Sequence, residues 1–112
     1  MRIAIPMAEG QLARHFGHCK EFAFLDVDPT MKEITSSAKA EAPEHEPGRL
    51  PRWLKEQGVS FVITGGIGAR AVALLEHSSI GVLSGAPRET PETLVRRYLD
   101  GVLTPGVNAC DH

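Results

Sequence analysis

Short runs that are either apolar throughout or alternate between apolar and polar residues open the chain, and they predict strands. Residues 2–6 (RIAIP) form the first run, and we expect Pro6 to end that strand. Residues 21–29 (EFAFLDVDP) form a second run, and residues 31–40 form a third that is more polar. Because Asp28-Pro29-Thr30 favours a turn, the second and third strands are predicted to form an antiparallel hairpin.

From residue 48 onward, helical and strand patterns alternate. Apolar side chains at 50, 53 and 54 have the spacing of a helix, which we expect to end at Gly58. Residues 59–64 (VSFVIT) form an almost continuous apolar run, which is typical of a strand buried on both faces of a parallel sheet. A glycine turn then leads into a predicted helix over 69–77.

The last predicted strand covers residues 80–83, and Thr90-Pro91 supplies an N-cap and a first-turn proline for a final helix. The order β-β-β-α-β-α-β-α predicts an α/β fold, with a mixed sheet of about five strands and helices on its faces. No internal repeat or long linker divides the chain. We therefore expect one domain over residues 1–103, followed by a flexible tail over 104–112.

Composition excludes several classes of protein. The 112 residues are 42% hydrophobic and 23% charged, which is typical of a globular domain. The net charge of −2 is spread evenly and aromatic residues make up only 5%, so we expect no nucleic-acid partner. No apolar run approaches the roughly 18 residues that span a bilayer, and no apolar leader opens the chain, so we expect a cytoplasmic protein without a membrane partner. In that compartment the two cysteines are expected to be free thiols or metal ligands.

The segment HFGHC gathers three potential metal ligands. His15, His18 and Cys19 stand at i, i+3 and i+4, so they would share one face of a helical turn. Imidazole and thiolate are usual ligands of zinc, copper and iron. The spacing matches no zinc motif and the chain has no CxxC pair, which disfavours a zinc site built from this segment alone. Three more distant donors would complete a metal site: His45, Cys110 and His112.

Three loops are expected to meet at the carboxyl edge of the sheet, where ligands of open α/β proteins bind. They are the loop that carries HFGHC, the turn TGGIGAR and the turn LSGAPR. The glycine turn offers N–H groups at a helix N-terminus, which favours an anion, and Arg14, Arg70 and Arg88 would add positive charge. The alternative is that these glycines only permit a tight turn. The spacing fits neither a dinucleotide-binding fingerprint nor a P-loop.

Catalytic patterns are weak, and we expect that the protein is not an enzyme. The chain has no GxSxG motif. A nucleophile pair of Cys19 with His15 or His18 has no evident third group to orient it.

Three segments, in this order, resemble the dinitrogenase iron–molybdenum cofactor biosynthesis family: RHFGHCKEFAFLDVD, EHEPGRLPRWLKEQGV and FVITGGIGARAVALLE. The resemblance covers residues 1–103, and HFG and GGxGxRA are its most specific parts. It implies a ribonuclease H-like three-layer fold without nuclease activity, which binds or carries a metal–sulfur cluster. It also implies a cofactor site that contains His15, with Gly65 and Gly66 close by. Members of the family are associated with P-loop ATPases that handle iron–sulfur clusters, and one branch, the orange proteins, holds a molybdenum–copper sulfide cluster.

The residues and the resemblance lead to three hypotheses. Clusters of this kind are anionic, so a pocket of Arg14, backbone N–H groups and imidazole suits them better than a ring of cysteines. The leading hypothesis is therefore a protein that binds, carries or scaffolds a Mo–Fe–S or Mo–Cu–S cluster during cofactor assembly. The second is a metal-free regulatory module that partners a cluster-handling P-loop ATPase. The third is a small hydrolase or thiol enzyme that uses Cys19.

Overall fold

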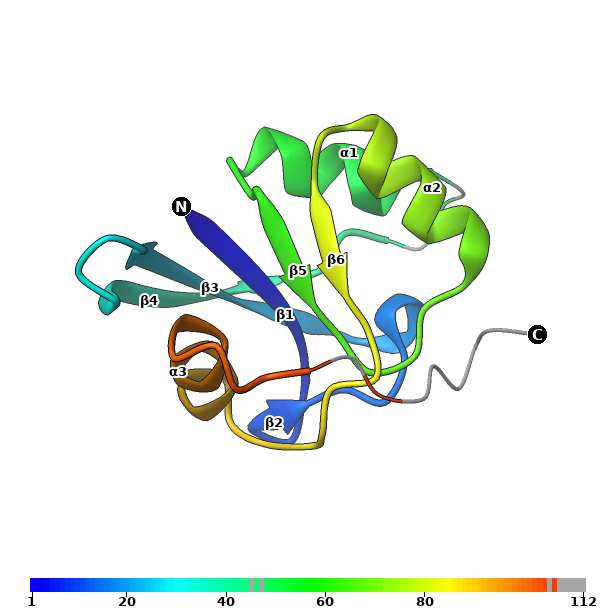
Figure 1. Ribbon diagram of the computed structural model, residues 1–112. Coiled ribbons are helices and arrows are strands. Elements are labelled where there is room, and N and C mark those ends of the chain that lie inside the picture. Colours follow the sequence, from blue (N-terminus) through cyan, green and yellow to red (C-terminus); the bar gives the residue numbers. More distant parts are fainter. Residues whose placement is uncertain (45, 47, 105, 107–112) are drawn as a thin grey trace.

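A computed structural model describes residues 1–44, 46, 48–104 and 106, with the side chain of His18 excepted. One mixed sheet forms the centre of the molecule, with its main strands in the order β4-β3-β1-β5-β6 (Figure 1). The bounds of these strands are β1 Arg2–Ala8, β3 Glu21–Asp28, β4 Glu33–Glu41, β5 Phe61–Ile63 and β6 Gly81–Leu83. Strands β1, β5 and β6 are parallel to one another, whereas β3 is antiparallel to both β1 and β4.

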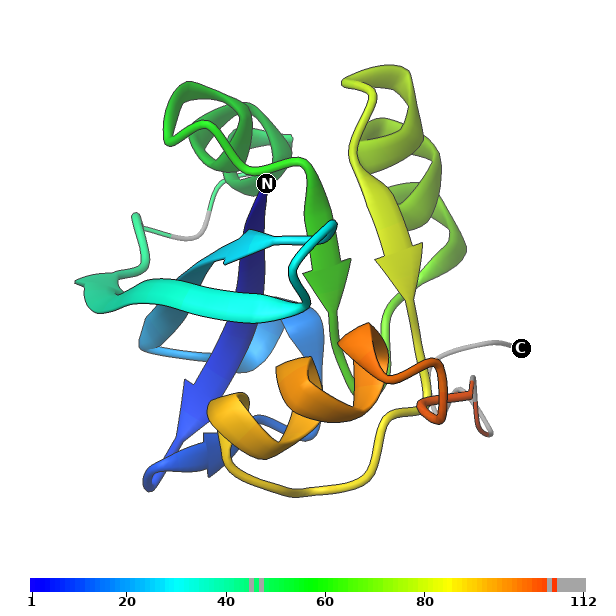
Figure 2. The same ribbon diagram turned by 60° about the vertical axis from the view of Figure 1, so that its left-hand side comes forward.

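Helices cover both faces of the sheet, which confirms the predicted three-layer α/β fold. Helices α1 (Arg49–Glu56) and α2 (Ala69–His77) lie on one face, and α3 (Pro91–Leu99) lies on the other (Figure 2). Each face has its own apolar core. The first contains Leu54 of α1 and Leu75 of α2, and the second contains Leu94 of α3. None of the helices in the described part of the chain is long and apolar enough to cross a membrane.

Local signals in the sequence produce most of the predicted elements. The Asp28 carboxylate accepts hydrogen bonds from the N–H groups of Thr30 and Met31, which stabilises the turn of the β3–β4 hairpin. Helix α1 ends just before Gly58, whose φ of +79° suits a glycine after a helix. Helix α3 begins at Pro91, with the Thr90 hydroxyl accepting from the N–H of Thr93.

The prediction that Pro6 ends the first strand is wrong, because β1 continues to Ala8. The Pro6 carbonyl accepts a hydrogen bond from the N–H of Ala13 at 2.7 Å, so it points away from β3. The nitrogen of a strand residue points to the same side as its carbonyl, so Pro6 removes no ladder bond between β1 and β3. The extra length supports a sixth strand, β2 (Gln11–Leu12), which pairs with β1 and was not predicted.

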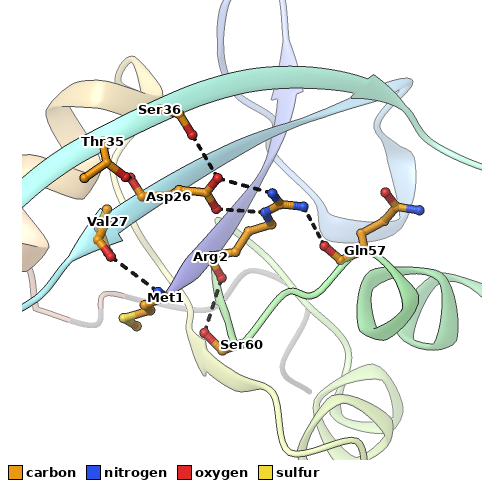
Figure 3. A network of polar contacts seen from close by, with 8 residues as sticks. All are labelled: Met1, Arg2, Asp26, Val27, Thr35, Ser36, Gln57 and Ser60. Atoms are coloured by element: carbon orange, nitrogen blue, oxygen red, sulfur yellow. Dashed lines mark hydrogen bonds and ion pairs between the residues drawn. The ribbon is translucent and has the colours of Figure 1, made fainter.

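The amino edge of the parallel strands is held by a polar network centred on Arg2 (Figure 3). The Arg2 guanidinium donates to the Asp26 carboxylate at 2.8 and 3.2 Å and to the carbonyl of Gln57 at 2.7 Å. The Ser36 hydroxyl donates to the same carboxylate at 2.8 Å. This network joins β1, β3, β4 and the end of α1 at the edge opposite to the loops described below.

Candidate functional site

Three loops follow the carboxyl ends of β1, β5 and β6, and backbone hydrogen bonds join them. The Gly66 N–H donates to the Arg14 carbonyl at 2.8 Å, and the Phe16 N–H donates to the Gly66 carbonyl at 2.8 Å. The Gly85 N–H donates to the Gly65 carbonyl, also at 2.8 Å. The predicted meeting of the HFGHC, GGIG and LSGAP loops at one edge is therefore confirmed.

A cavity of about 390 Å³ lies between these loops, and we name it the arginine cavity. Its volume is within the range of small-molecule sites. Its lining consists of two arginines and of small or apolar residues: Leu12, Ala13, Arg14, Gly65, Gly66, Gly85, Ala86 and Arg88. None of these described lining residues is acidic, so the charge that they bring to the cavity is positive.

Unused hydrogen-bond donors lie in the same walls. Among the described residues, the backbone N–H groups of Arg14 and Gly65 donate to no acceptor. The side chain of Arg14 is exposed and has no hydrogen-bonding or acidic partner in the described part of the chain. The cavity therefore combines a free guanidinium with backbone donors, which together suit an anion.

Gly65 allows the loops to approach closely. A Cβ atom at this position would lie 2.7 Å from the Arg14 carbonyl oxygen and 3.2 Å from that of Ala13. Both contacts are with backbone, which does not move aside as the end of a flexible side chain does. The glycine thus does more than permit a turn, because it allows two walls of the arginine cavity to touch.

His15 lies beside the cavity, but it is not one of the residues that line it. Its backbone forms a parallel bridge with Gly66, and its side chain is partly exposed. The predicted neighbourhood of His15, Gly65 and Gly66 is confirmed, while a contact between the imidazole and a ligand stays a prediction.

Cys19 faces a different region of the molecule. It is half-buried, its Sγ lies 3.5 Å from the Phe16 carbonyl oxygen, and burial raises the pKa of the thiol to about 11. At neutral pH the group is a protonated thiol, which makes it a poor nucleophile. It lines a separate cavity of about 790 Å³. The other residues around that cavity come from the ends of β1, β3 and β4: Met7, Ala8, Glu9, Lys20, Glu21, Glu41, Ala42 and Pro43.

The three arginines predicted at this edge do not line the same cavity. Arg14 and Arg88 line the arginine cavity, whereas Arg70 lines a third cavity together with Phe16, Gly17 and residues of α1. The contribution of Arg70 to the charge at this edge stays a prediction. Arg70 stands in the first turn of α2 and lines the cavity that α2 shares with α1, away from Gly85 and Ala86.

The predicted metal ligands are tested only in part. His45, Cys110, His112 and the side chain of His18 lie outside the described residues. Within the described ranges, no group of three or more histidine, cysteine, aspartate or glutamate residues is placed to hold a metal ion. Ligation by His15, His18, Cys19, His45, Cys110 or His112 stays a prediction.

Two features of the cavity were not predicted from the sequence. Leu12, at the end of the two-residue strand β2, and Ala13, directly after it, form part of the cavity wall, and this strand is too short for a hydrophobic pattern to indicate. Behind Gly85, the chain after α3 returns to the edge of the sheet, where the Gly106 N–H donates to the Ser84 carbonyl at 3.2 Å. A Cβ atom on Gly85 would overlap the backbone of Gly106.

Comparison with known proteins agrees with this fold. The chain is 29% identical to PH0822, whose crystal structure superposes with a TM-score of 0.85 over 94% of both chains. The apo orange protein of Desulfovibrio gigas is 24% identical, with a TM-score of 0.75 over 96% of this chain and 93% of that one, which supports the fold alone. An uncharacterized protein of Methanocaldococcus jannaschii is 24% identical over 92% of this chain and 89% of its own length. The profile of the family described as dinitrogenase iron-molybdenum cofactor matches residues 1–101, and the chain belongs to this family.

Proposed function

We propose that this protein binds an anionic metal–sulfur cluster of the Mo–Fe–S or Mo–Cu–S type as cargo, in the arginine cavity, and carries it during cofactor assembly. Membership of the family connects the chain with the binding or handling of metal clusters. The observation that carries the proposal is a cavity lined by Arg14 and Arg88, with no acidic residue among the described residues of its walls. The proposal includes no catalytic step.

The shape and chemistry of the site fit reversible binding. The guanidinium groups and the backbone N–H groups attract an anion without forming covalent bonds to it, so the cargo can leave intact. His15, next to Arg14 and bridged to Gly66, lies beside the cavity, where we propose that its imidazole contacts the cargo. Cys19 faces another cavity, so the arginines and the backbone N–H groups are proposed as the main contacts, and ligation by Cys110 stays a prediction.

Anaerobic titration tests the proposal, with tetrathiomolybdate as the probe, alone and together with Cu(I). We expect a charge-transfer absorption and bound molybdenum in the wild type. The Arg14→Ala and Arg88→Ala variants are each expected to bind about tenfold more weakly, because each removes a charge-assisted hydrogen bond. Arg52→Ala is the matched control, since Arg52 is an exposed arginine of α1 outside the arginine cavity.

Two results would contradict the proposal. One is a wild-type protein that takes up no molybdenum. The other is equal affinity of Arg14→Ala, Arg88→Ala and Arg52→Ala for the probe, which would place the binding site elsewhere. A His15→Ala/Cys19→Ala double variant then measures what these two side chains add to retention of the metal.

A further inference from the structure

The turn between β1 and β2 holds a glutamate in an unfavourable backbone conformation. Ala8 pairs with Gln11, so Glu9 and Gly10 form a two-residue hairpin turn, and their φ angles are +54° and +80°. Turns with positive φ at both positions favour asparagine, aspartate and glycine. A glutamate there costs conformational free energy, and such an outlier next to a binding site suggests a functional reason.

The carboxylate of this glutamate contacts one of the two arginines that line the arginine cavity. Its Oε2 atom lies 3.3 Å from Nη2 of Arg88, which lines the cavity. The side chains of Glu9 and Arg88 are 87% and 55% exposed, so water and other anions reach the ion pair. In the described part of the chain, Arg88 therefore has an acidic partner while Arg14 has none.

Backbone hydrogen bonds hold the hairpin in this position. The Leu12 N–H donates to the Glu89 carbonyl at 3.0 Å, and the Ala13 N–H donates to the Pro6 carbonyl at 2.7 Å. Strand β2 is thereby attached to the loop that carries Arg88, and Figures 1 and 2 show the hairpin beside this loop. The contact between Glu9 and Arg88 thus joins two segments that the backbone already places together.

We infer that Glu9 is a built-in competitor for anions in the arginine cavity and a determinant of its specificity. An anion that uses both arginines must displace the carboxylate from Arg88. Anions with several charges gain enough from the two guanidinium groups to do so, and weakly charged ions gain less. The inference rests on the proposed function, because it concerns the affinity of the same cavity.

The test measures the affinity for tetrathiomolybdate of the wild type, Glu9→Gln and Glu89→Gln. Glu89→Gln is the matched control, since it changes the net charge equally one residue from Arg88, while its carboxylate contacts Arg97, which does not line the cavity. We expect Glu9→Gln to bind about two- to fivefold more tightly, the effect of releasing an exposed ion pair, and Glu89→Gln to bind like the wild type.

A second pair of variants separates the effect of the Glu9 charge on affinity from the effect of backbone strain on stability. Glu9→Gly removes the carboxylate and suits the positive φ, so we expect it to bind more tightly and to unfold at a higher temperature. Lys32→Gly, at another residue with a φ of +54°, is expected to raise the unfolding temperature without any change in affinity.

The outcomes distinguish this inference from the proposed function. If the wild type binds the probe and Glu9→Gln binds no more tightly, the inference is overturned and the proposed function stands. Equal tightening in Glu9→Gln and Glu89→Gln also overturns it, because a general change in charge would then explain the gain. If no protein binds the probe, both are overturned.

Discussion

At position 65, the absence of a single methyl group lets two loops meet. We predict that Gly65→Ala lowers the free energy of unfolding by about 1–3 kcal/mol, because its Cβ atom would be forced against backbone oxygens. Gly68→Ala is the matched control in the same turn, since a Cβ atom there meets nothing within 4 Å, and it should cost less than about 1 kcal/mol. Urea unfolding measures both. Equal losses would show that the glycines serve only the turn.

The thiol of Cys19 gives a second prediction at the scale of one residue. Burial raises its pKa to about 11 from an ordinary value of 9.0, so its thiolate fraction at pH 8 is about 100-fold lower than that of a free cysteine. In a Cys110→Ser variant, iodoacetamide should therefore modify Cys19 about 100-fold more slowly than it modifies a cysteine in an unfolded control in urea. Rapid alkylation of the folded protein would revive the hypothesis of a thiol enzyme.

Residue types in the sequence were sufficient to predict some members of the site and not others. Arg14, Gly65 and Gly66 were predicted and do line one cavity. Cys19, four residues from His15, faces another cavity, because the short 3-10 helix η1 (Phe16–His18) turns the chain between them. Neighbours in sequence are separated in this way by local backbone geometry, which composition and spacing do not encode.

Among the elements of secondary structure, three strands and a helix are connected by the network around Arg2 (Figure 3). This network also makes the free energy of unfolding depend on pH. Hydrogen bonds from Arg2 and Ser36 lower the pKa of Asp26. A carboxylate whose pKa is lower in the folded state than in the unfolded state stabilises the protein fully at pH values above the unfolded-state pKa. This stabilisation is lost as the pH falls through the folded-state pKa.

We therefore expect Asp26→Asn to be less stable than the wild type near neutral pH. The difference should be no more than about 1 kcal/mol, since both side chains of the pair are about one-third exposed. As the pH falls from about 4, the ordinary pKa of an aspartate, toward the lower pKa of Asp26, the difference should disappear. Urea unfolding at a series of pH values measures it. A constant difference down to pH 2 would mean that the charge of Asp26 is not responsible.

Hydrophobic periodicity predicted the helices because each packs an apolar face into one of the two cores. Helix α2 was predicted over 69–77 and is observed as Ala69–His77, and the β3–β4 hairpin was predicted from its turn residues. Strand β2 escaped prediction because two residues cannot show a period. The effect of Pro6 depends on which side of β1 its carbonyl faces, and only the assembled sheet determines that.

At the scale of the whole molecule, Gly85 and Gly106 bring the chain after α3 against the wall of the arginine cavity. Two effects make alanine at position 85 destabilising. The backbone φ there is +72°, and the added Cβ atom would overlap the backbone of Gly106. Comparing Gly85→Ala in the full chain and in a chain that ends at Thr104 separates the two effects, because the shortened chain lacks Gly106 and retains only the strain of the positive φ. We expect the alanine to cost about 1 kcal/mol in the shortened chain and about 1–3 kcal/mol more in the full chain. Thermal unfolding of the four proteins measures how much stability the alanine removes from each chain. Equal losses in the full and shortened chains would contradict a contact between these glycines.

The position of Gly106 also determines at which end of the chain a tag is best fused. Met1 lies at the amino edge of the sheet, where its ammonium group donates to the Val27 carbonyl, whereas Gly106 lies at the carboxyl edge beside Gly85. A purification tag or fluorescent reporter attached directly after Gly106 would begin beside the wall of the arginine cavity, and a polyhistidine tag there would bring metal ligands of its own. Fusions that precede Met1 would begin on the opposite edge and leave metal-loading measurements undisturbed.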